Sequence, residues 1–540
     1  MKEPGLITDK AMVVSAHPLA TQVGVDILKK GGNAVDAMVG VQFALAVTLP
    51  AAGNIGGGGF MVFRGKNGNV HTLDFREMAP SAAHRGLYLD STGNVIKDLS
   101  FLGHMAAGVP GSVAGMWAAH DSLGKLPWNE VVEPAIRLAQ DGFLVTEKEA
   151  EGTNKKMEKL LEYNTRSNVF TSKSTWNTGD SIVHKDLGKT LTMIKDKGPD
   201  GFYDGWVADS IVAEMQRGGG IMTHEDLENY HAVWRKPLRG TYDEYEIISM
   251  PPPSSGGVAL LQLLAMVEKE PLDALGWHSA DAAHVMVEAE RRVYADRAVH
   301  LGDPDFYKVP VEGLLDKKYL KARMSNYHPS QASSSTKIGA GQPAVKESEE
   351  TTHYSIVDAE GNAVSVTTTL NGGYGSYVLV GGAGFLLNNE MDDFAVKPGF
   401  PNAYGLLGAE ANKVEAGKRM LSSMTPTIVT RGGSLFMVVG TPGGATIITS
   451  VFQTFLNVAE YGMSMQGAVR APRFHHQWLP DTLYHEPNAF AYQPDKTLKR
   501  MGHIRKERDP IGRVDAILVL PGGKLEAGAD PRGDDVAGGF

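Results

Sequence analysis

The feature that most constrains the fold is a predicted β-hairpin that begins where a long polar connector ends. Residues 329–350 (PSQASSSTKIGAGQPAVKESEE) are small, polar or charged and show no periodicity, which predicts a flexible connector. Two predicted strands follow, joined by the loop 358–362. If the residues that border this loop pair with each other, Thr351 lies opposite Thr369 on the same face of the hairpin. Paired threonines are common in ordinary sheets, so this pair alone indicates no function.

The rest of the chain alternates between strands and helices without regular βαβ units. Residues 105–330 are mostly helical by period. Further predicted elements are the strands 353–358, 363–370, 425–430 and 434–440 and a helix at about 446–461. This pattern favours an α+β fold in packed layers.

The N-terminal part predicts a buried helix and a second hairpin. Residues 34–47 are almost entirely apolar, but they are too few to span a membrane. Asn67-Gly68 separates two alternating runs, which is a strong hairpin signal. A two-residue turn at this point would set Arg76 opposite Gly59, within a glycine cluster. The alternative is an arginine exposed to solvent at a strand end.

Composition excludes several classes of protein. The 540 residues contain no cysteine, which excludes disulfides, a cysteine nucleophile, iron–sulfur clusters and thiolate zinc sites. A formal net charge of −10 argues against a nucleic-acid binder that relies on a broad positive field. The first four residues, MKEP, do not begin an apolar run of the kind that marks a signal peptide.

Two pairs of residues that contain histidine have side chains able to bind a metal. His284 and Glu288 are four residues apart on a predicted helix, and we interpret them as a surface pair because no further ligand is nearby in sequence. His475 and His476 are adjacent on a predicted strand and would face opposite ways. We therefore expect no metal and no cofactor.

Two loops carry the other chemical signals. The turn 440–444 (GTPGG) ends an apolar strand and opens a helix, so its N–H groups suit a phosphate or an oxyanion; a nucleotide site fits the same pattern, although Gly-x-Gly-x-x-Gly is missing. The segment 388–393 (NNEMDD) is typical of a solvated turn or a calcium loop, but it follows an apolar run that could draw it inward.

Taken together and in order, these motifs resemble the γ-glutamyltransferase family. The resemblance covers nearly the whole chain and rests on the segments GNIGGGGF at 53–60, DFREMAP at 74–80, MPPPSSGG at 250–257, TTHYSIV at 351–357, VTTTLN at 366–371, LNNEMDDF at 387–394, RMLSSMTPT at 419–427, GTPGG at 440–444 and RFHHQWLP at 473–480.

The resemblance implies a fold and a maturation step. Members are N-terminal-nucleophile hydrolases built as a four-layer αββα sandwich. Their precursor cuts itself just before a threonine, which here falls between Glu350 and Thr351. The chain would become a large piece, 1–350, whose tail is about 329–350, and a small piece, 351–540, and the two would stay associated in one compact unit.

The resemblance also assigns roles to residues. Thr351 would be the nucleophile, its freed α-amine the base, and Thr369 would orient it. Gly443 and Gly444 would form the oxyanion hole.

For the substrate, Arg76 would bind the α-carboxylate, with hydroxyl donors from Ser422 and Ser423. The α-ammonium would be held by Asn371, Glu390 and Asp393. Opposite charges at two ends of the pocket would then identify a zwitterionic glutamyl head.

Residues 398–408 resemble the lid loop of some members, with Tyr404 as the gate, which favours small γ-glutamyl compounds such as glutathione. Acceptors would be water, amino acids or peptides, and the family resemblance implies export to the periplasm or the medium. Two alternatives stay open: a glutaryl (cephalosporin) acylase of the same fold, and a silent binding protein that never matures.

Overall fold

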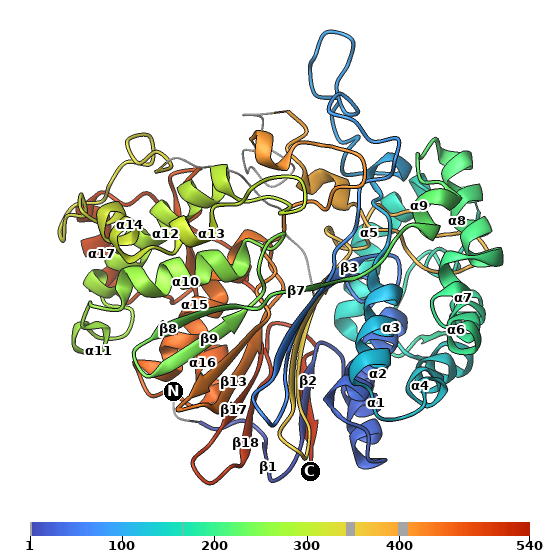
Figure 1. Ribbon diagram of the computed structural model, residues 1–540, viewed down its shortest axis with the longest axis horizontal. Coiled ribbons are helices and arrows are strands. Elements are labelled where there is room, and N and C mark those ends of the chain that lie inside the picture. Colours follow the sequence, from blue (N-terminus) through green and yellow to red (C-terminus); the bar gives the residue numbers. More distant parts are fainter. Residues whose placement is uncertain (1–2, 165, 342–351, 398–408) are drawn as a thin grey trace.

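The computed structural model describes residues 3–164, 166–341, 352–397 and 409–540. Its central feature is a pair of seven-stranded antiparallel sheets that pack face to face (Figure 1). Sheet 1 consists, in spatial order, of β19 (Val536–Gly539), β2 (Met12–Ser15), β10 (Thr352–Val357), β11 (Ala363–Thr369), β3 (Gly58–Arg64), β4 (Val70–Phe75) and β7 (Val233–Arg235). Sheet 2 consists of β1 (Ile7–Thr8), β18 (Leu525–Gly528), β17 (Asp515–Val519), β13 (Ser434–Gly440), β12 (Thr427–Arg431), β9 (Tyr245–Ser249) and β8 (Leu238–Tyr242). Two small sheets are formed by β5 (Phe143–Leu144) with β6 (Ser181–Ile182), and by β14 (Phe474–His475), β15 (Leu483–His485) and β16 (Arg505–Glu507).

Helices cover the outer face of each sheet. On sheet 1 lie α1 (Pro18–Lys29), α2 (Ala34–Thr48) and α3 (Ser112–Leu123), with α4 (Trp128–Asp141), α5 (Glu147–Glu162), α6 (Lys185–Lys197), α7 (Asp200–Tyr203), α8 (Gly205–Gly218) and α9 (His224–Glu228) on the same side (Figure 1). On sheet 2 lie α10 (Gly256–Val267), α15 (Ala445–Ala459) and α16 (Met465–Arg470), with α11 (Leu272–Leu275), α12 (Ala280–His300), α13 (Val311–Leu314), α14 (Lys317–Arg323) and α17 (Tyr492–Met501) on that side. The order of layers is helix, sheet, sheet, helix, which confirms the αββα expectation.

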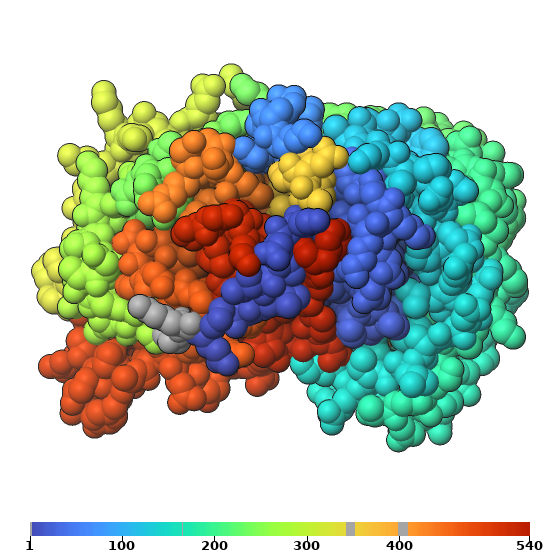
Figure 2. Space-filling view, turned by 90° about the horizontal axis from the view of Figure 1, so that it is seen from below, coloured from blue at the N-terminus to red at the C-terminus, as the bar shows by residue number. Residues whose placement is uncertain are grey.

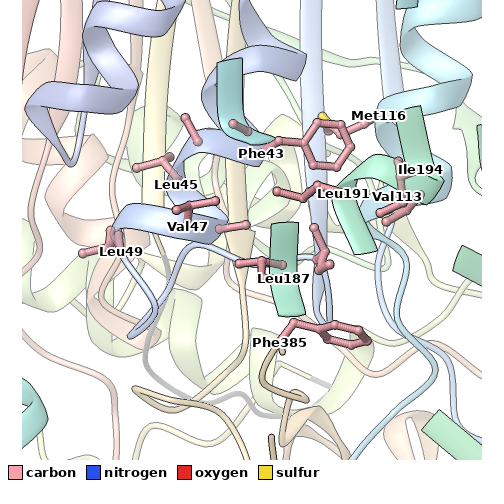
Figure 3. Packing of buried hydrophobic residues seen from close by; sticks show 14 of the residues in the cluster. Phe43, Leu45, Val47, Leu49, Val113, Met116, Leu187, Leu191, Ile194 and Phe385 are labelled. Atoms are coloured by element: carbon pink, nitrogen blue, oxygen red, sulfur yellow. The ribbon is translucent and has the colours of Figure 1, made fainter. Parts of the chain in front are cut away.

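Apolar burial holds the layers together, both between the two sheets and around the buried helix α2. Alternate residues of the strands, such as Val62, Val438 and Ile517, fill the space between the sheets. Every residue of α2 is buried, which confirms the predicted apolar helix. Its side chains pack against those of α3 and α6 (Figure 3). The one amide in α2, Gln42, donates to the carbonyl of Asn54 (2.9 Å) and to the Thr368 hydroxyl (3.3 Å), so this polar side chain ties the helix to sheet 1.

The hairpin of β3 and β4 forms, but the predicted two-residue turn is wrong. The Gly65 N–H donates to the carbonyl of Asn69 (2.8 Å), so the turn contains three residues and ends on Gly68, at φ +86°. The register shifts by one, and Gly59 pairs with Phe75. Arg76 therefore follows the ladder directly, and its side chain is buried.

The hairpin of β10 and β11 has the predicted register. Val357 pairs with Ala363, and the pairs continue to Thr352 with Thr368. On its other edge β11 pairs with β3, where Thr369 lies opposite Gly58. Thr351 lies outside the described residues.

Each sheet is assembled from both ends of the chain. In sheet 1, β19 pairs with β2, and in sheet 2, β18 pairs with β1. Figure 2 shows the N-terminal and C-terminal segments side by side on one face. A break within 342–351 would therefore leave strands of both pieces paired in both sheets.

Residues 329–341 differ from the flexible connector that their composition predicts. Ala332 N–H donates to the carbonyl of Met501 (2.7 Å), and the indole of Trp478 donates to the carbonyl of Ile338 (2.7 Å). Gly341 N–H donates to the Asp296 carboxylate on α12 (2.9 Å). Backbone hydrogen bonds anchor this stretch, and such bonds leave no periodicity in the sequence. Residues 342–350 lie outside the described residues.

The helices vary in length and hydropathy, and a membrane-spanning helix needs about 20 mostly apolar residues. Within the described ranges, none is both long enough and apolar enough to traverse a membrane.

We predict that Gly57→Ala lowers the Tm. A Cβ at this position would overlap the carbonyl oxygen of Thr369, so β3 and β11 would have to move apart. Overpacking of this kind costs about 1–3 kcal/mol. Calorimetry of the variant measures the effect. Gly313→Ala, where a Cβ meets nothing within 4 Å, is the matched control, and an equal Tm for the two variants would contradict this account.

Candidate active site

The end of β11 is fixed by an amide that the sequence reasoning did not single out. The Asn54 side chain donates to the Thr369 carbonyl (2.9 Å) and to the Thr368 hydroxyl (3.1 Å). Its oxygen accepts hydrogen bonds from Gly57 N–H (3.1 Å) and from the Ser112 hydroxyl (2.6 Å). All of these groups are buried, so the strand end has a defined position.

Asn371 lies next to this strand end. Its backbone adopts φ +69°, and its N–H donates to the Thr369 hydroxyl (2.7 Å). Its side chain donates to the carbonyl of Asn389 (3.0 Å), which precedes the acidic turn Glu390–Asp393. The structure therefore brings together Thr369, Asn371 and the acidic turn, as the resemblance implies.

Arg76 is buried among carboxylates. Its guanidinium contacts Glu390 (2.8 Å), Asp393, and Glu77 (3.4 Å). The alternative of an exposed strand-end arginine is wrong, since the residue is 1% exposed. The cation and the acids are in direct contact and do not lie at two ends of a pocket.

Arg76 also holds the backbone of the next motif. Its Nε and one terminal nitrogen donate to the carbonyls of Met420 (3.2 Å) and Leu421 (3.1 Å). Ser422 and Ser423 follow directly, so the arginine and the two serines form one cluster with the acids.

The loop 251–257 (PPPSSGG) is hydrogen-bonded to the backbone of the serine pair. Ser255 N–H and its hydroxyl both donate to the Ser422 carbonyl (2.6 and 2.7 Å), and Ser422 N–H donates to the carbonyl of Pro253 (2.9 Å). Both Ser422 and Ser423 are 2% exposed. Hydrogen bonds to the distant segment 253–255 therefore fix the position of the serine pair.

The glycine turn opens α15, as predicted. Gly443 (φ +131°) and Gly444 (φ +55°) adopt backbone conformations that residues with a Cβ rarely take. In the part of the chain that the structure describes, no acceptor is bonded to the N–H of either glycine. The preceding Gly440 packs on the ring of His353 in β10, so the turn lies near the start of that strand.

Burial changes the acid–base behaviour of Glu77. The side chain is fully buried, and this desolvation raises its pKa to about 7 in spite of the neighbouring Arg76. One carboxyl oxygen, Oε1, has no hydrogen-bond partner among the described residues. Glu77 is a titratable member of the cluster that the sequence analysis overlooked, although it stands beside Arg76 in the DFREMAP segment.

The interpretation of His284 and Glu288 as a surface pair is wrong, because both side chains are fully buried. His284 is hydrogen-bonded to His503 (2.8 Å), and Glu288 pairs with Arg292 (2.7 Å). Glu288 is thus neutralised by arginine within the core. The described residues contain no group of three or more His, Asp or Glu side chains arranged to hold a metal.

Three predicted site residues lie outside the described residues: Glu350, Thr351 and Tyr404. The structure describes all the other predicted catalytic and substrate-binding residues. Apart from Gly443 and Gly444, they belong to the cluster around Arg76 and the end of β11.

Comparisons with known proteins identify the family. A family model described as Gamma-glutamyltranspeptidase matches residues 20–540. The chain is 47% identical over 536 residues to the glutathione hydrolase proenzyme of Escherichia coli, covering 98% of this chain and 92% of the relative. The corresponding proenzyme of Pseudomonas aeruginosa is 48% identical over 533 residues, covering 98% and 94%. This chain belongs to the gamma-glutamyltranspeptidase family.

Solved structures support the fold of this family member. The cephalosporin acylase of Bacillus halodurans is similar with a TM-score of 0.89 and 26% identity, covering 100% of this chain and 97% of that chain. The gamma-glutamyltranspeptidase of Helicobacter pylori is similar with a TM-score of 0.60 and 44% identity, covering 63% of this chain and 97% of that chain. The α+β sandwich predicted from the resemblance is confirmed.

We predict that Glu77→Gln changes how stability depends on pH. The folded protein holds a proton on Glu77 up to a pKa of about 7, whereas an ordinary glutamate releases it near 4.5. The stability that this group contributes is therefore present below pH 4.5 and lost as the pH rises through 7.

Glutamine mimics the protonated form at every pH. The Tm of the wild type should fall relative to that of Glu77→Gln over this pH range. Parallel Tm curves would show that Glu77 ionises normally.

Proposed function

We propose that this protein is a self-processing γ-glutamyltransferase that cleaves glutathione and other γ-glutamyl amides. It passes the γ-glutamyl group to water or to amino acids and peptides. The observation that carries the proposal is the buried cluster of Arg76, its carboxylates and the serine pair beside the end of β11, in a chain of this family.

Thr351 is the proposed nucleophile and Thr369 the residue that orients it. A threonine hydroxyl needs a base, and a free N-terminal amine has a pKa of about 7.7–8.0, so it can accept the proton near neutral pH. Before the Glu350–Thr351 bond breaks, this nitrogen is an amide and cannot act as a base. Attack of the Thr351 hydroxyl on the Glu350 carbonyl forms an ester, and water opens that ester and frees the amine.

The charges of the cluster fit the head of a glutamyl group. An α-carboxylate and an α-ammonium are attached to the same carbon, so a site for both needs a cation and an anion in close proximity. Arg76 and Asp393 are in direct contact, as are Arg76 and Glu390. In this proposal the substrate carboxylate takes over contacts of Arg76 and is bound by the serines, while its ammonium pairs with the acids and Asn371.

The glycine turn is the proposed oxyanion hole. Attack on the γ-carbonyl places negative charge on its oxygen, and the N–H groups of Gly443 and Gly444 at the start of α15 are suited to stabilise it. Loss of such a donor typically costs about 10²–10³ in rate. The proposed reaction requires no cofactor.

The proposed products of maturation are the pieces 1–350 and 351–540. The length of the Helicobacter pylori chain supports this division, because it matches over 97% of itself but spans only 63% of this chain. Strand pairing between the two pieces, β1 with β18 and β2 with β19, would keep them together in both sheets. We also propose, from the family resemblance, that the enzyme acts in the periplasm or the medium, which cell fractionation tests.

The glutaryl acylase alternative is disfavoured by charge. A glutaryl group has the carboxylate but lacks the α-ammonium, so it offers Glu390 and Asp393 no positive charge to pair with, and the two acids would repel its carboxylate. Hydrolysis of γ-glutamyl p-nitroanilide should exceed that of glutaryl p-nitroanilide. Faster turnover of the glutaryl compound would favour the acylase.

We predict that the wild-type protein gives two bands on denaturing electrophoresis, of 350 and 190 residues, and that Thr351→Ala gives one. The variant lacks the hydroxyl that attacks Glu350. An intact wild-type chain would instead support a silent binding protein.

We predict that Arg76→Lys raises KM for γ-glutamyl p-nitroanilide about 10-fold or more, because lysine lacks the planar fork of donors. Cleavage of the precursor should continue, since the substrate clamp does not act on the Glu350 carbonyl. Arg239→Lys, at an exposed ion pair with Glu246, is the control. An unchanged KM would remove Arg76 from substrate binding.

A further inference from the structure

Arg297 contacts the serine pair, Ser422 and Ser423, through Ser423 Oγ, and the proposed chemistry gives it no role so far. It is on α12 and is 1% exposed. Its Nε donates to the Ser255 hydroxyl (2.8 Å), and a terminal nitrogen donates to the Ser423 hydroxyl (3.1 Å). One guanidinium thus contacts both the PPPSSGG loop and the serine pair that this loop supports.

These contacts determine where the hydroxyl protons point. Arg297 has no lone pair to accept with, so it occupies an acceptor position on Ser423 Oγ and leaves the hydroxyl proton for another acceptor. Ser422 Oγ is in the same situation, because it accepts from Met424 N–H (3.2 Å). No acceptor for either hydroxyl proton is present in the described ranges.

Ser255 links Arg297 to the backbone of Ser422. Its hydroxyl accepts from Arg297 and donates to the Ser422 carbonyl, so the direction of this hydrogen bond is set as well. The segment 420–423 is thereby held between two buried guanidiniums, with Arg76 on the carbonyls of Met420 and Leu421 and Arg297 on Ser423.

We propose that Arg297 is a positioning residue that presets Ser423 as a hydrogen-bond donor to the substrate α-carboxylate. This inference rests on the proposed function. Arg297 acts through Ser423 and does not touch the substrate. It therefore makes the enzyme selective for acyl groups that carry an α-carboxylate.

The test compares two anilides that differ only in this carboxylate. γ-Glutamyl p-nitroanilide carries it, and 4-aminobutyryl p-nitroanilide keeps the amine and the scissile amide but lacks it. Arg297→Gln should raise KM for the first about 10-fold with kcat changed less than about twofold, as expected for the loss of one charge-assisted hydrogen bond. The kcat/KM for the second should be unchanged. A general structural defect would reduce turnover of both.

A double-mutant cycle tests the route of the effect. In a Ser423→Ala background, Arg297→Gln should change KM less than about twofold, because the group through which it acts is gone. Equal effects in the two backgrounds would overturn the proposal. Arg292→Gln is the matched control. Arg292 is a buried arginine on the same helix, but it pairs with Glu288 and does not contact Ser422 or Ser423.

Maturation must be read out alongside the kinetics. If the wild type does not hydrolyse γ-glutamyl p-nitroanilide, the proposed function fails. If the wild type is active but Arg297→Gln leaves its KM unchanged, only this inference fails. If Arg297→Gln does not mature, Arg297→Lys is used in its place. It should raise KM for γ-glutamyl p-nitroanilide by a smaller factor and leave kcat/KM for 4-aminobutyryl p-nitroanilide unchanged. Failure of both to mature, with Arg292→Gln mature, would assign Arg297 to folding and overturn the proposal.

Discussion

The pairing of β11 with β10 and β3 in the middle of sheet 1 is the constraint on which the rest of the structure depends. A slip of one residue would reverse every side chain of the strand between the two faces of a sheet that is buried on both. The correct register brings Thr369 against Gly58 and within reach of Asn54 and Asn371. Because β10 follows the proposed cut and β3 precedes it, the same ladder would hold the two pieces together.

Buried guanidinium groups organise the other side of the site. A charge removed from water must be neutralised and hydrogen-bonded, so each arginine forms ion pairs or hydrogen bonds with residues from distant parts of the chain. Arg76 joins β4 to the acidic turn and to the 420–421 backbone, and Arg297 joins α12 to the serine pair. The interactions that fold this region and those proposed to bind substrate therefore share the same side chains.

Local pattern was sufficient to predict the elements, but distant contacts decided the details. The buried helix predicted over 34–47, which the structure shows as Ala34–Thr48, and the β10–β11 register followed from an apolar run and one short loop. The turn before β4 contained one residue more than expected, because Gly68 accommodates a positive φ in a three-residue turn. The burial of Arg76 depends on Glu390 and Asp393, which are far away in sequence. Glu288 is buried against Arg292 on its own helix, and backbone hydrogen bonds anchor 329–341. The roles of Asn54, Glu77 and Arg297 could not be recognised before these contacts were known.

The central claim is that a backbone nitrogen at residue 351 becomes a free amine and serves as the base for the adjoining hydroxyl. N-terminal sequencing of the shorter piece, isolated from enzyme that is turning over a γ-glutamyl amide, tests this most directly. The account predicts the sequence Thr-Thr-His-Tyr, starting at Thr351. A different first residue, or full activity in a preparation that contains only the uncut chain, would contradict it.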